Sequence, residues 1–274
     1  TQLCFKCKNK KFYHATLERC IKDSFLGSML GTIENYIYTF MGTYTRHIDY
    51  YVVANSFMKN LLCDYGIDKE KIVKVLNPIK VDAYKPCYEG DNYYVYFGRL
   101  SEEKGIFTLI DAAKEVKKAR LIIIGSGNIE GKLKEYVSSN DITNIEFVGP
   151  KWNEQLNAIV RKAKFVVVPS EWYENSPYVI YQAYSLGKPV IGSDVNGGIS
   201  ELIQNGKNGL LFPSANSTIL AEKINYLLDR DELVKEMSAN AREFAENQFD
   251  IENIYKKFIS IYQAAKEKKC HNNI

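Results

Sequence analysis

The sequence predicts an α/β fold in which parallel strands alternate with helices. Short runs rich in β-branched residues recur along the chain, and most are followed by turn residues and a stretch with helical apolar spacing. The run at 165–168 is apolar on both faces, as expected for a strand inside a parallel sheet. The composition, with 46% hydrophobic and 25% charged residues, is that of a globular protein. We therefore expect repeated βα units.

The charge balance argues against a dedicated nucleic-acid-binding protein, because the formal net charge is only +3 at pH 7. The basic residues of the first segment are either a solvated face or a surface for an anionic membrane or acceptor (Lys6, Lys8, Lys10 and Lys11). No apolar run reaches the roughly 18 residues that span a bilayer, and no signal-peptide pattern is present. We expect a cytoplasmic protein. Because the chain begins with Thr1 rather than Met, we also expect a fragment that lacks an upstream segment.

Three cysteines and a histidine near the amino terminus have spacings that suit a structural zinc site. Cys4 and Cys7 form a Cys-x2-Cys pair, and His14 and Cys20 follow. The alternative is that these are reduced cysteines in a mobile segment. The other cysteines are too scattered to indicate a disulfide framework (Cys63, Cys87 and Cys270).

The first part of the chain predicts a long helix followed by a strand–helix–strand unit. Apolar residues recur at helical spacing across residues 24–45, which indicates either a helix packed on a sheet or an interfacial helix that approaches lipid or a lipid-linked acceptor. Strands are expected at 50–54 and 72–76, and a helix capped by Ser56 is expected between them. Residues 79–92 are predicted to be a linker.

The second part of the chain predicts a longer series of βα units. We expect strands at 93–97, 121–124, 145–148, 165–168, 190–191 and 209–212. Helices are expected after each of the first four strands, with a short one near 199–201. Three more are expected at about 217–228, 231–247 and 251–268.

The stretch from Pro169 to Asp194 has the features of a ligand site. A helix is predicted to begin at Ser176 and Pro177, with serine as its N-cap, and to end at Gly187. A helix N-terminus at the carboxyl end of a parallel strand attracts anions. The carboxylate of Glu174 lies just ahead of it and can accept hydrogen bonds from a polyol. Together these features indicate a nucleotide sugar.

This stretch resembles the donor-site signature of family-4 glycosyltransferases of the GT-B fold. The matching features are Pro169-Ser170, Glu174, a helix with a polar residue at Gln182, and Gly187-Lys188-Pro189-Val190. In the family the second position is also Glu. The resemblance implies two Rossmann-like domains, with the amino-terminal one incomplete. It places the acceptor-side domain at 1–82, the donor-binding domain at 83–250, and a helix that packs back toward the first domain at 251–274.

The resemblance also assigns roles to individual residues. Arg99 and Lys104 match the cations that contact the donor diphosphate, where fixed positive charge stabilises the leaving group. Glu174 matches the residue that contacts the sugar hydroxyls, and we expect Arg99, Lys104 and Glu174 to be the catalytic residues. Gln182 occupies the place of the glutamate that holds the ribose, and it accepts hydrogen bonds through one oxygen without charge. Asn175 and Ser176 would present hydrogen-bond donors to sugar and phosphate.

Three glycines are further candidates for the donor site: Gly98, Gly125 and Gly127. A glycine lets the backbone approach a ligand closely. The sequence after Gly127 does not continue the nicotinamide-dinucleotide fingerprint, so that class of enzyme is disfavoured. Asp229-Arg230-Asp231 resembles a metal-binding motif of the other large glycosyltransferase fold, but its place between two helices favours a helix cap.

We therefore expect a retaining glycosyltransferase that needs no metal or other cofactor and moves a sugar from a nucleoside-diphosphate sugar to a glycan or lipid-linked acceptor. The resemblance implies a cytoplasmic enzyme, with peripheral contact at the inner face of the membrane if the acceptor is lipid-linked. One alternative is a non-catalytic nucleotide-sugar-binding subunit, which the glutamine at position 182 favours. Another is a nucleotide-sugar epimerase with a similar fold.

Overall fold

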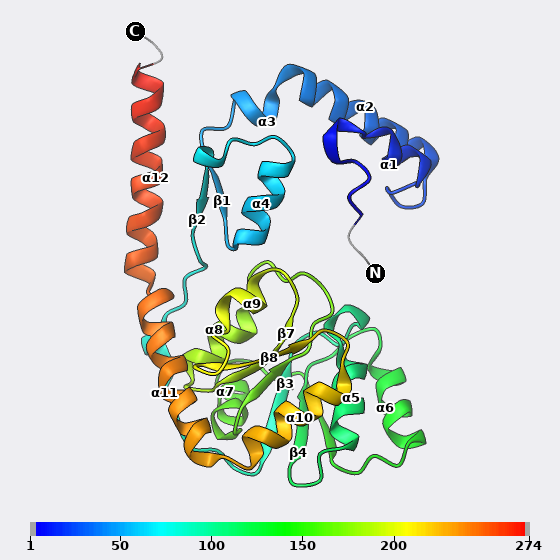
Figure 1. Ribbon diagram of the computed structural model, residues 1–274, viewed down its shortest axis with the longest axis vertical. Helices are drawn as coiled ribbons and strands as arrows, with labels where there is room; N and C mark the ends of the chain where they lie inside the picture. The colour runs from blue at the N-terminus through cyan, green and yellow to red at the C-terminus, as the bar shows by residue number, and fades with distance from the viewer. Residues whose placement is uncertain (1–3, 272–274) are drawn as a thin grey trace. The chain divides into compact units, whose positions relative to one another are not determined.

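The chain forms two compact units in a computed structural model that describes residues 4–271. The first unit contains the described residues up to Val75 together with those from Lys256 onward. The second unit contains Leu76–Tyr255. Figure 1 shows the chain coloured from its amino terminus to its carboxyl terminus.

A six-stranded parallel sheet forms the centre of the second unit (Figure 1), in the spatial order β5-β4-β3-β6-β7-β8. Its strands follow the apolar runs of the sequence, so the predicted α/β fold with a parallel sheet is confirmed. Their bounds are β3 Tyr93–Phe97, β4 Arg120–Ile124, β5 Ile145–Gly149, β6 Val166–Val168, β7 Val190–Asp194 and β8 Gly209–Pro213.

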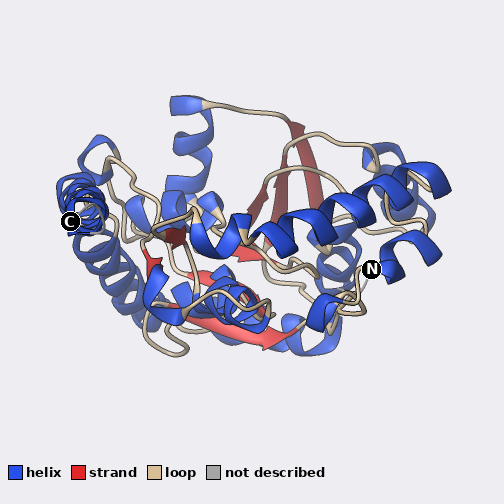
Figure 2. Cartoon of the chain, turned by 90° about the horizontal axis from the view of Figure 1, so that it is seen from above, coloured by secondary structure: helices blue, strands red, loops and turns tan. Residues whose placement is uncertain are grey.

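Helices cover both faces of this sheet; in Figure 2 helices are blue and strands red. Alternate side chains of β3 enter two different cores: Tyr94 and Tyr96 one, Val95 and Phe97 the other. This explains why β3 is buried at every position. The helices of this unit are α5 Ile106–Lys114, α6 Glu130–Ser139, α7 Asn153–Lys162, α8 Tyr178–Ser185, α9 Gly198–Leu202, α10 Ser217–Leu228 and α11 Asp231–Gln248, and α12 Ile251–His271 begins here.

The strand order reverses direction between β3 and β6. From β3 the chain moves outward through β4 to β5, and it then returns to place β6 on the other side of β3. All pairings are parallel, so the carboxyl ends of the strands share one edge of the sheet. In open α/β sheets the crevice at such a reversal is the usual place for a ligand. The loops that follow β3 and β6 lie at this reversal.

Two predicted helix starts are wrong in detail. Helix α8 begins at Tyr178, because Pro177 has an extended conformation with φ −72° and ψ 97°. The hydroxyl of Ser176 donates to the Tyr181 hydroxyl at 3.0 Å and caps nothing. In the first unit, Asn55 rather than Ser56 caps α4, and its side-chain oxygen accepts from the backbone N–H of Met58 at 2.7 Å. The left-handed Gly187, with φ +69°, ends α8 as predicted.

The first unit contains a small parallel sheet and several helices. Strands β1 Tyr51–Val53 and β2 Ile72–Lys74 pair in parallel, and Val53, Ile67 and Ile72 form a small buried cluster beside them. The other elements are α1 Tyr13–Leu17, α2 Phe25–Met41, α3 Thr43–Arg46 and α4 Ser56–Asp64.

Helix α2 buries polar residues and exposes apolar ones. Its buried residues are Ser28 and Thr32, and the Thr32 hydroxyl lies 2.8 Å from the hydroxyl of Thr16 on α1. The apolar side chains at the predicted helical spacing are mostly exposed among residues 4–271, with Phe40 91% exposed. Helix α2 lies within the predicted range of residues 24–45. In the described part of the chain, however, its apolar residues do not pack on a sheet as one of the two predictions had it. Nor is any helix of that part long and apolar enough to cross a bilayer.

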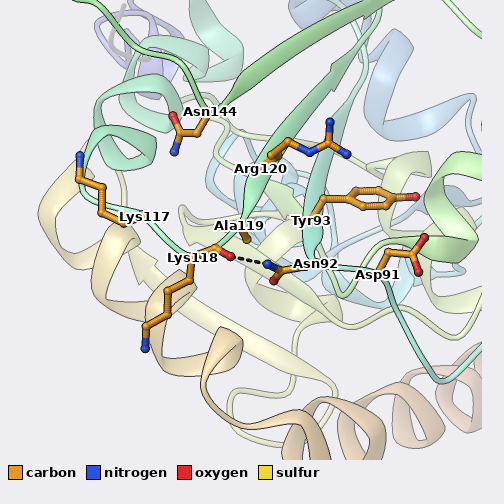
Figure 3. A pocket seen from close by; sticks show the side chains of 8 residues that line it. All are labelled: Asp91, Asn92, Tyr93, Lys117, Lys118, Ala119, Arg120 and Asn144. Carbon is orange, nitrogen blue, oxygen red and sulfur yellow. Dashed lines mark hydrogen bonds between the residues drawn. The ribbon is translucent and has the colours of Figure 1, made fainter.

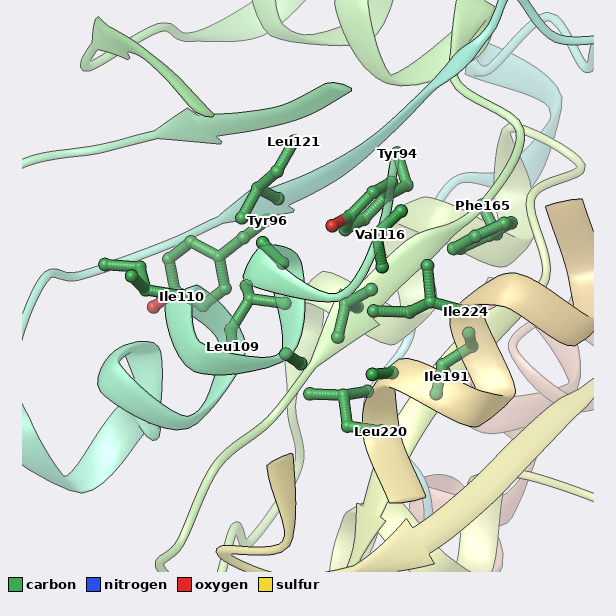
Figure 4. Close-up of a cluster of buried hydrophobic side chains, with 14 of the residues drawn as sticks. Tyr94, Tyr96, Leu109, Ile110, Val116, Leu121, Phe165, Ile191, Leu220 and Ile224 are labelled. Carbon is green, nitrogen blue, oxygen red and sulfur yellow. The ribbon is translucent and has the colours of Figure 1, made fainter. Parts of the chain in front are cut away.

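The Tyr94 hydroxyl is a buried group without a hydrogen-bond partner among the described residues (Figure 4). Tyr94 is fully buried, and its ring stacks on Phe165 with centroids 5.6 Å apart. The neighbouring Tyr96 differs, because its hydroxyl donates to the backbone oxygen of Arg99 at 2.7 Å.

We predict that Tyr94→Phe leaves the free energy of unfolding unchanged or raises it by up to about 2 kcal/mol, since it removes an unsatisfied polar atom and keeps the ring. The control, Tyr96→Phe, should lower it by about 1 kcal/mol because it removes a made hydrogen bond. Urea unfolding monitored by circular dichroism measures both. A Tyr94→Phe protein less stable than Tyr96→Phe would contradict this account.

Lys188 is a fully buried cation in the second unit. Its ammonium group donates to the backbone oxygen of Glu89 at 2.7 Å, which attaches the segment before β3 to the start of β7. Burial lowers the pKa of Lys188 from its usual 10.5 to about 8, although the nearby Cys87 and Asp91 raise it. The folded protein therefore holds fewer protons than the unfolded chain between pH 8 and 10.5.

We predict that this lysine makes stability rise with pH. Because the folded-state pKa is depressed, its contribution is lowest below pH 8 and increases by about 2 kcal/mol between pH 7.5 and 9.5. Urea unfolding of the wild type and of Lys188→Met across this range measures the effect, and groups common to both proteins cancel in the difference. Parallel pH profiles would show that Lys188 does not titrate in this window.

Candidate functional site

An ion pair lies at the carboxyl edge of the sheet, where the strand order reverses. The Lys104 ammonium, from the loop after β3, contacts Oε1 of Glu174, from the loop after β6. The two side chains are 30% and 18% exposed, so the pair is partly shielded from solvent yet reachable. The structure thus brings together two of the three residues predicted to be catalytic, although 70 positions separate them.

Ser170 holds this carboxylate in place, and the sequence analysis did not identify that role. It is 1% exposed, and its hydroxyl donates to the same Glu174 Oε1 at 3.0 Å. The same hydroxyl lies 3.2 Å from the backbone oxygen of Glu103 and 3.3 Å from that of Trp172. Since Oε1 has both Lys104 and Ser170 as partners, Oε2 is the carboxylate oxygen left for a ligand among the described residues. The sequence feature that could have indicated this role is a serine shortly after the end of a buried strand.

The loops after β3 and β6 are fastened to each other by close backbone contacts. Gly105 has φ +66°, and a Cβ atom there would lie only 2.0 Å from the Pro169 oxygen. The Glu171 N–H donates to the Glu103 oxygen at 2.9 Å. The Glu171 side chain also accepts from the Thr108 hydroxyl of α5 at 2.6 Å. Only glycine permits this approach, and the approach sets the position of Lys104.

A cleft of about 310 Å³ extends along the same edge, over the ends of β3, β4 and β5. Arg99 is exposed in this cleft, and its side chain has no ion-pair partner within residues 4–271. The third predicted catalytic residue therefore borders an open space. The cleft is lined by Phe97, Gly98, Arg99, Ile124, Gly125, Ser126, Pro150, Lys151, Trp152 and Leu156.

Two of the three predicted donor-site glycines, Gly125 and Gly127, are required by loop packing. Gly125 has φ +143°, and a Cβ atom there would lie 1.9 Å from the Gly98 oxygen. A Cβ atom at Gly127 would lie 2.0 Å from the Leu100 oxygen. The backbone that approaches these glycines belongs to the neighbouring loop. Gly98 and Gly125 also line the cleft, so these two remain predicted ligand contacts.

Charges at this edge perturb two further groups. The pKa of the Glu103 carboxyl is lowered by a hydrogen bond from the Ser101 hydroxyl at 2.6 Å, by its own backbone N–H, and by the charges of Lys104 and Arg99. The pKa of Tyr96 is raised, mainly by burial and further by the negative charges of Glu174 and Glu103. The edge therefore carries two acids alongside two cations, and a bound anion would rely on Arg99 and Lys104 together.

Gln182 lies on α8 and contacts α7. Its amide nitrogen donates to Oδ1 of Asn157, on α7, at 2.9 Å. Glu174 lies in the loop before α8, whereas Gln182 lies within that helix. Asn175 is exposed in the loop between Glu174 and α8. This loop is held by the Gly198 N–H, which donates to the Glu174 oxygen at 2.7 Å.

The structure shows no ready metal site in the part of the chain that it describes. Within residues 4–271, no three or more His, Cys, Asp or Glu side chains gather closely enough to hold a metal ion. Zinc binding by Cys4, Cys7 and Cys20 therefore stays a prediction. Asp229 is the C-cap residue of α10, as expected of a helix cap, and its carboxylate pairs with Lys118. Asp231 is the first residue of α11, where no side-chain cap hydrogen bond forms, and it pairs with Lys164.

A second hollow of about 350 Å³ lies at the amino ends of β3 and β4 (Figure 3). Its polar groups already bind each other or nearby residues. The Asn144 amide donates to two backbone oxygens of the second unit, at 2.6 and 2.8 Å, and Arg120 pairs with Glu146 at 3.4 Å. Ligands of open α/β sheets bind at the opposite, carboxyl edge. We therefore take the cleft beside Arg99 and the Lys104–Glu174 pair as the candidate site.

The sequence resembles those of known glycosyltransferases. A sequence model of the family "Glycosyl transferases group 1" matches residues 82–244, more than half of the chain. The uncharacterized glycosyltransferase MJ1178 of Methanocaldococcus jannaschii is 33% identical over 202 residues, which cover 73% of this chain and 56% of that protein. The O-antigen chain mannosyltransferase C of Escherichia coli is 24% identical over 181 residues, covering 66% and 48%. The chain thus spans about half the length of these curated relatives.

Solved structures resemble the fold. The crystal structure of Anabaena Alr3699/HepE in complex with UDP has a TM-score of 0.73 at 21% sequence identity, and the match covers 79% of this chain and 64% of that one. A mutant of S. aureus TarM in complex with fondaparinux, alpha-GlcNAc-glycerol and UDP has a TM-score of 0.73 at 23% identity, covering 86% and 46%. At these identities the similarity confirms the α/β, GT-B-type fold.

We predict that the Ser170 hydroxyl and the Glu174 carboxylate are energetically coupled in the free protein. A hydrogen bond to a charged group contributes about 1.5–3 kcal/mol, so Ser170→Ala should lower the free energy of unfolding by about that amount. In Glu174→Ala the same serine substitution should cost at least 1 kcal/mol less. Urea unfolding of the four proteins of this double-mutant cycle gives the coupling energy. Strictly additive effects would mean that the contact does not hold the carboxylate.

Proposed function

Because the chain belongs to the Glycosyl transferases group 1 family, we propose that it carries out retaining transfer of a sugar from a nucleoside-diphosphate sugar to a glycan or lipid-linked acceptor. The observation that carries this proposal is the Lys104–Glu174 pair, held by Ser170 at the reversal of strand order. A nucleotide sugar needs cations for its diphosphate and a hydrogen-bond acceptor for its sugar hydroxyls. Both kinds of group meet here.

The positions of the charges support one orientation of the donor. In this proposal Arg99 and Lys104 hold the diphosphate, and the free Oε2 of Glu174 accepts from the sugar hydroxyls. The nucleoside then extends from Arg99 into the cleft over β4 and β5, toward the backbone of the 148–152 loop. Gln182 stays near α7, where its oxygen can accept from a ribose hydroxyl while Asn157 accepts from its nitrogen.

The proposed reaction separates negative charge onto the leaving group. The bond between the anomeric carbon and the β-phosphate oxygen breaks, and its electron pair leaves with the nucleoside diphosphate. An acceptor hydroxyl forms the new bond on the same face of the sugar, and its proton passes to the departing phosphate. Arg99 and Lys104 stabilise the charge that grows on that phosphate. Two fixed cations can supply this stabilisation without a metal cofactor.

We propose that residues 83–250 form the donor-binding domain and that residues 1–82 belong to an acceptor-side Rossmann-like domain, to which the helix at 251–274 returns. A two-stranded parallel sheet supports the second assignment, because such sheets are normally part of larger ones with both faces covered. In this proposal the exposed apolar side chains of α2 either pack on other parts of the acceptor-side domain or contact the inner face of a membrane. Flotation of the protein with lipid vesicles would indicate membrane contact, and its absence would favour packing within the domain.

A non-catalytic nucleotide-sugar-binding subunit is the competing function, because an uncharged residue stands at position 182. Gln182→Glu should raise donor affinity in either case. Only a transferase also releases nucleoside diphosphate from a nucleotide sugar, so product release by the wild type decides between them.

We predict that the protein binds UDP or GDP with a dissociation constant that Mg²⁺ and EDTA leave unchanged. Arg99→Ala should weaken this binding by at least tenfold, because it removes a cation that faces the diphosphate. Isothermal titration calorimetry of both nucleotides with both proteins measures this. Lys132→Ala, in which an exposed lysine paired with Glu102 is lost, is the matched control and should bind as the wild type does.

The two clear negative results have different meanings. Binding that requires Mg²⁺ would overturn the metal-independent part of the proposal. Absence of binding for both nucleotides would overturn the assignment of the cleft to a nucleotide-sugar donor.

A further inference from the structure

Trp152 presents a large aromatic surface at the lip of the cleft. Its side chain is 67% exposed, although it lines the same hollow as Gly98, Arg99 and Gly125. Across residues 4–271, its ring stacks on no other aromatic ring and lies over no cation. The chain has only two tryptophans, and the other, Trp172, packs edge-on against Tyr173 with centroids 6.1 Å apart.

The backbone fixes Trp152 in its place. It is the residue before α7, with φ −136° and ψ 161°, and its oxygen accepts from the N–H groups of Gln155 and Leu156 at 3.2 and 3.4 Å. Leu156, one turn into the helix, lines the same cleft. The backbone position of Trp152 is therefore set before a ligand binds, and only the torsions of its side chain remain to be ordered when a flat ligand covers the ring.

The order of groups along the sheet edge matches the order of groups in a nucleotide sugar. Trp152 follows β5, Gly125 follows β4, Arg99 follows β3 and Glu174 follows β6. In the sheet these four strands are consecutive neighbours. At about 4.8 Å per strand, the distance from the end of β5 to the end of β6 is roughly 14 Å. An extended nucleoside-diphosphate sugar has a similar length.

We propose that the indole of Trp152 stacks on the base of the donor nucleotide and supplies much of the affinity for the nucleoside half. This inference rests on the proposed nucleotide-sugar site. Stacking on an aromatic ring accepts every base, because each base has a π-face. Trp152 therefore determines that a base is bound, while hydrogen bonds from the backbone of the cleft select which base. The polar glycine loops and Arg99 beside it suit a nucleoside better than an acyl chain.

Fluorescence of a single-tryptophan protein tests the contact directly. In Trp172→Phe all tryptophan emission comes from Trp152, and titration with UDP, GDP and inorganic pyrophosphate reports on its surroundings. We expect the nucleotide that binds, UDP or GDP, to quench the emission and pyrophosphate to leave it unchanged. Emission that stays constant while calorimetry shows UDP or GDP bound would overturn the proposal.

Affinity measurements on Trp152 variants complete the test. Because stacking contributes about 1–3 kcal/mol per base, Trp152→Ala should weaken binding of the nucleotide by about 5- to 150-fold. Affinity for pyrophosphate should not change, and Trp152→Phe should recover most of the nucleotide affinity. Circular dichroism checks that each variant is folded. If Trp152→Ala does not fold, the fluorescence titration of Trp172→Phe still tests the proposal, because that variant keeps Trp152.

The outcomes separate this inference from the proposed function. If UDP or GDP binds equally well to the wild type and to Trp152→Ala, the donor site stands and the stacking role is wrong. If neither nucleotide binds the wild type, the donor site and the stacking role are both wrong. An equal loss of pyrophosphate and nucleotide affinity in Trp152→Ala would show a general disturbance of the cleft and would also overturn the stacking role.

Discussion

The close approach of the loops after β3 and β6 is the constraint on which the candidate site depends. Gly105 lies so near the Pro169 oxygen that no side chain fits between them, and the Ser170 hydroxyl joins both loops to Glu174. This contact exists only because the strand order reverses and places β6 beside β3. A lysine and a glutamate that are distant in the sequence thereby become an ion pair at one end of the sheet. Because the two loops are held by buried contacts, Lys104 and Glu174 are positioned more firmly than they would be on flexible surface loops.

Much of the fold could be predicted because it depends on burial. Strands such as β3 and β6 are covered on both faces, so their sequences are continuously apolar and easily recognised. Lys104 and Glu174 each follow a strand. Because the carboxyl ends of parallel strands share one edge of the sheet, the two residues lie at the same edge. The start of α8 was harder, because the φ of Pro177 suits either a helix or an extended segment and only ψ decides. The Gln182–Asn157 contact joins two helices and has no local signal in the sequence.

The glycines show how one sequence feature can serve two purposes. We expected Gly98, Gly125 and Gly127 to let the backbone approach a ligand. The observed contacts of Gly125 and Gly127 are with the loop after β3, and these contacts alone would exclude a side chain. Glycine at these positions is therefore no evidence for a ligand by itself. The stronger evidence is that Gly98 and Gly125 also line a cleft together with a cation and an exposed indole.

The Lys104–Glu174 pair has a consequence for selectivity if the donor binds as proposed. In the free protein each group neutralises the other, and both are partly buried, so neither can be left alone without a desolvation cost. A nucleoside diphosphate would satisfy Lys104 but would offer nothing to Glu174. A nucleotide sugar would satisfy both, since its phosphate replaces the carboxylate and its hydroxyls replace the ammonium. The pair would therefore favour the intact donor over its nucleotide product, and release of the product would be assisted by re-formation of the ion pair.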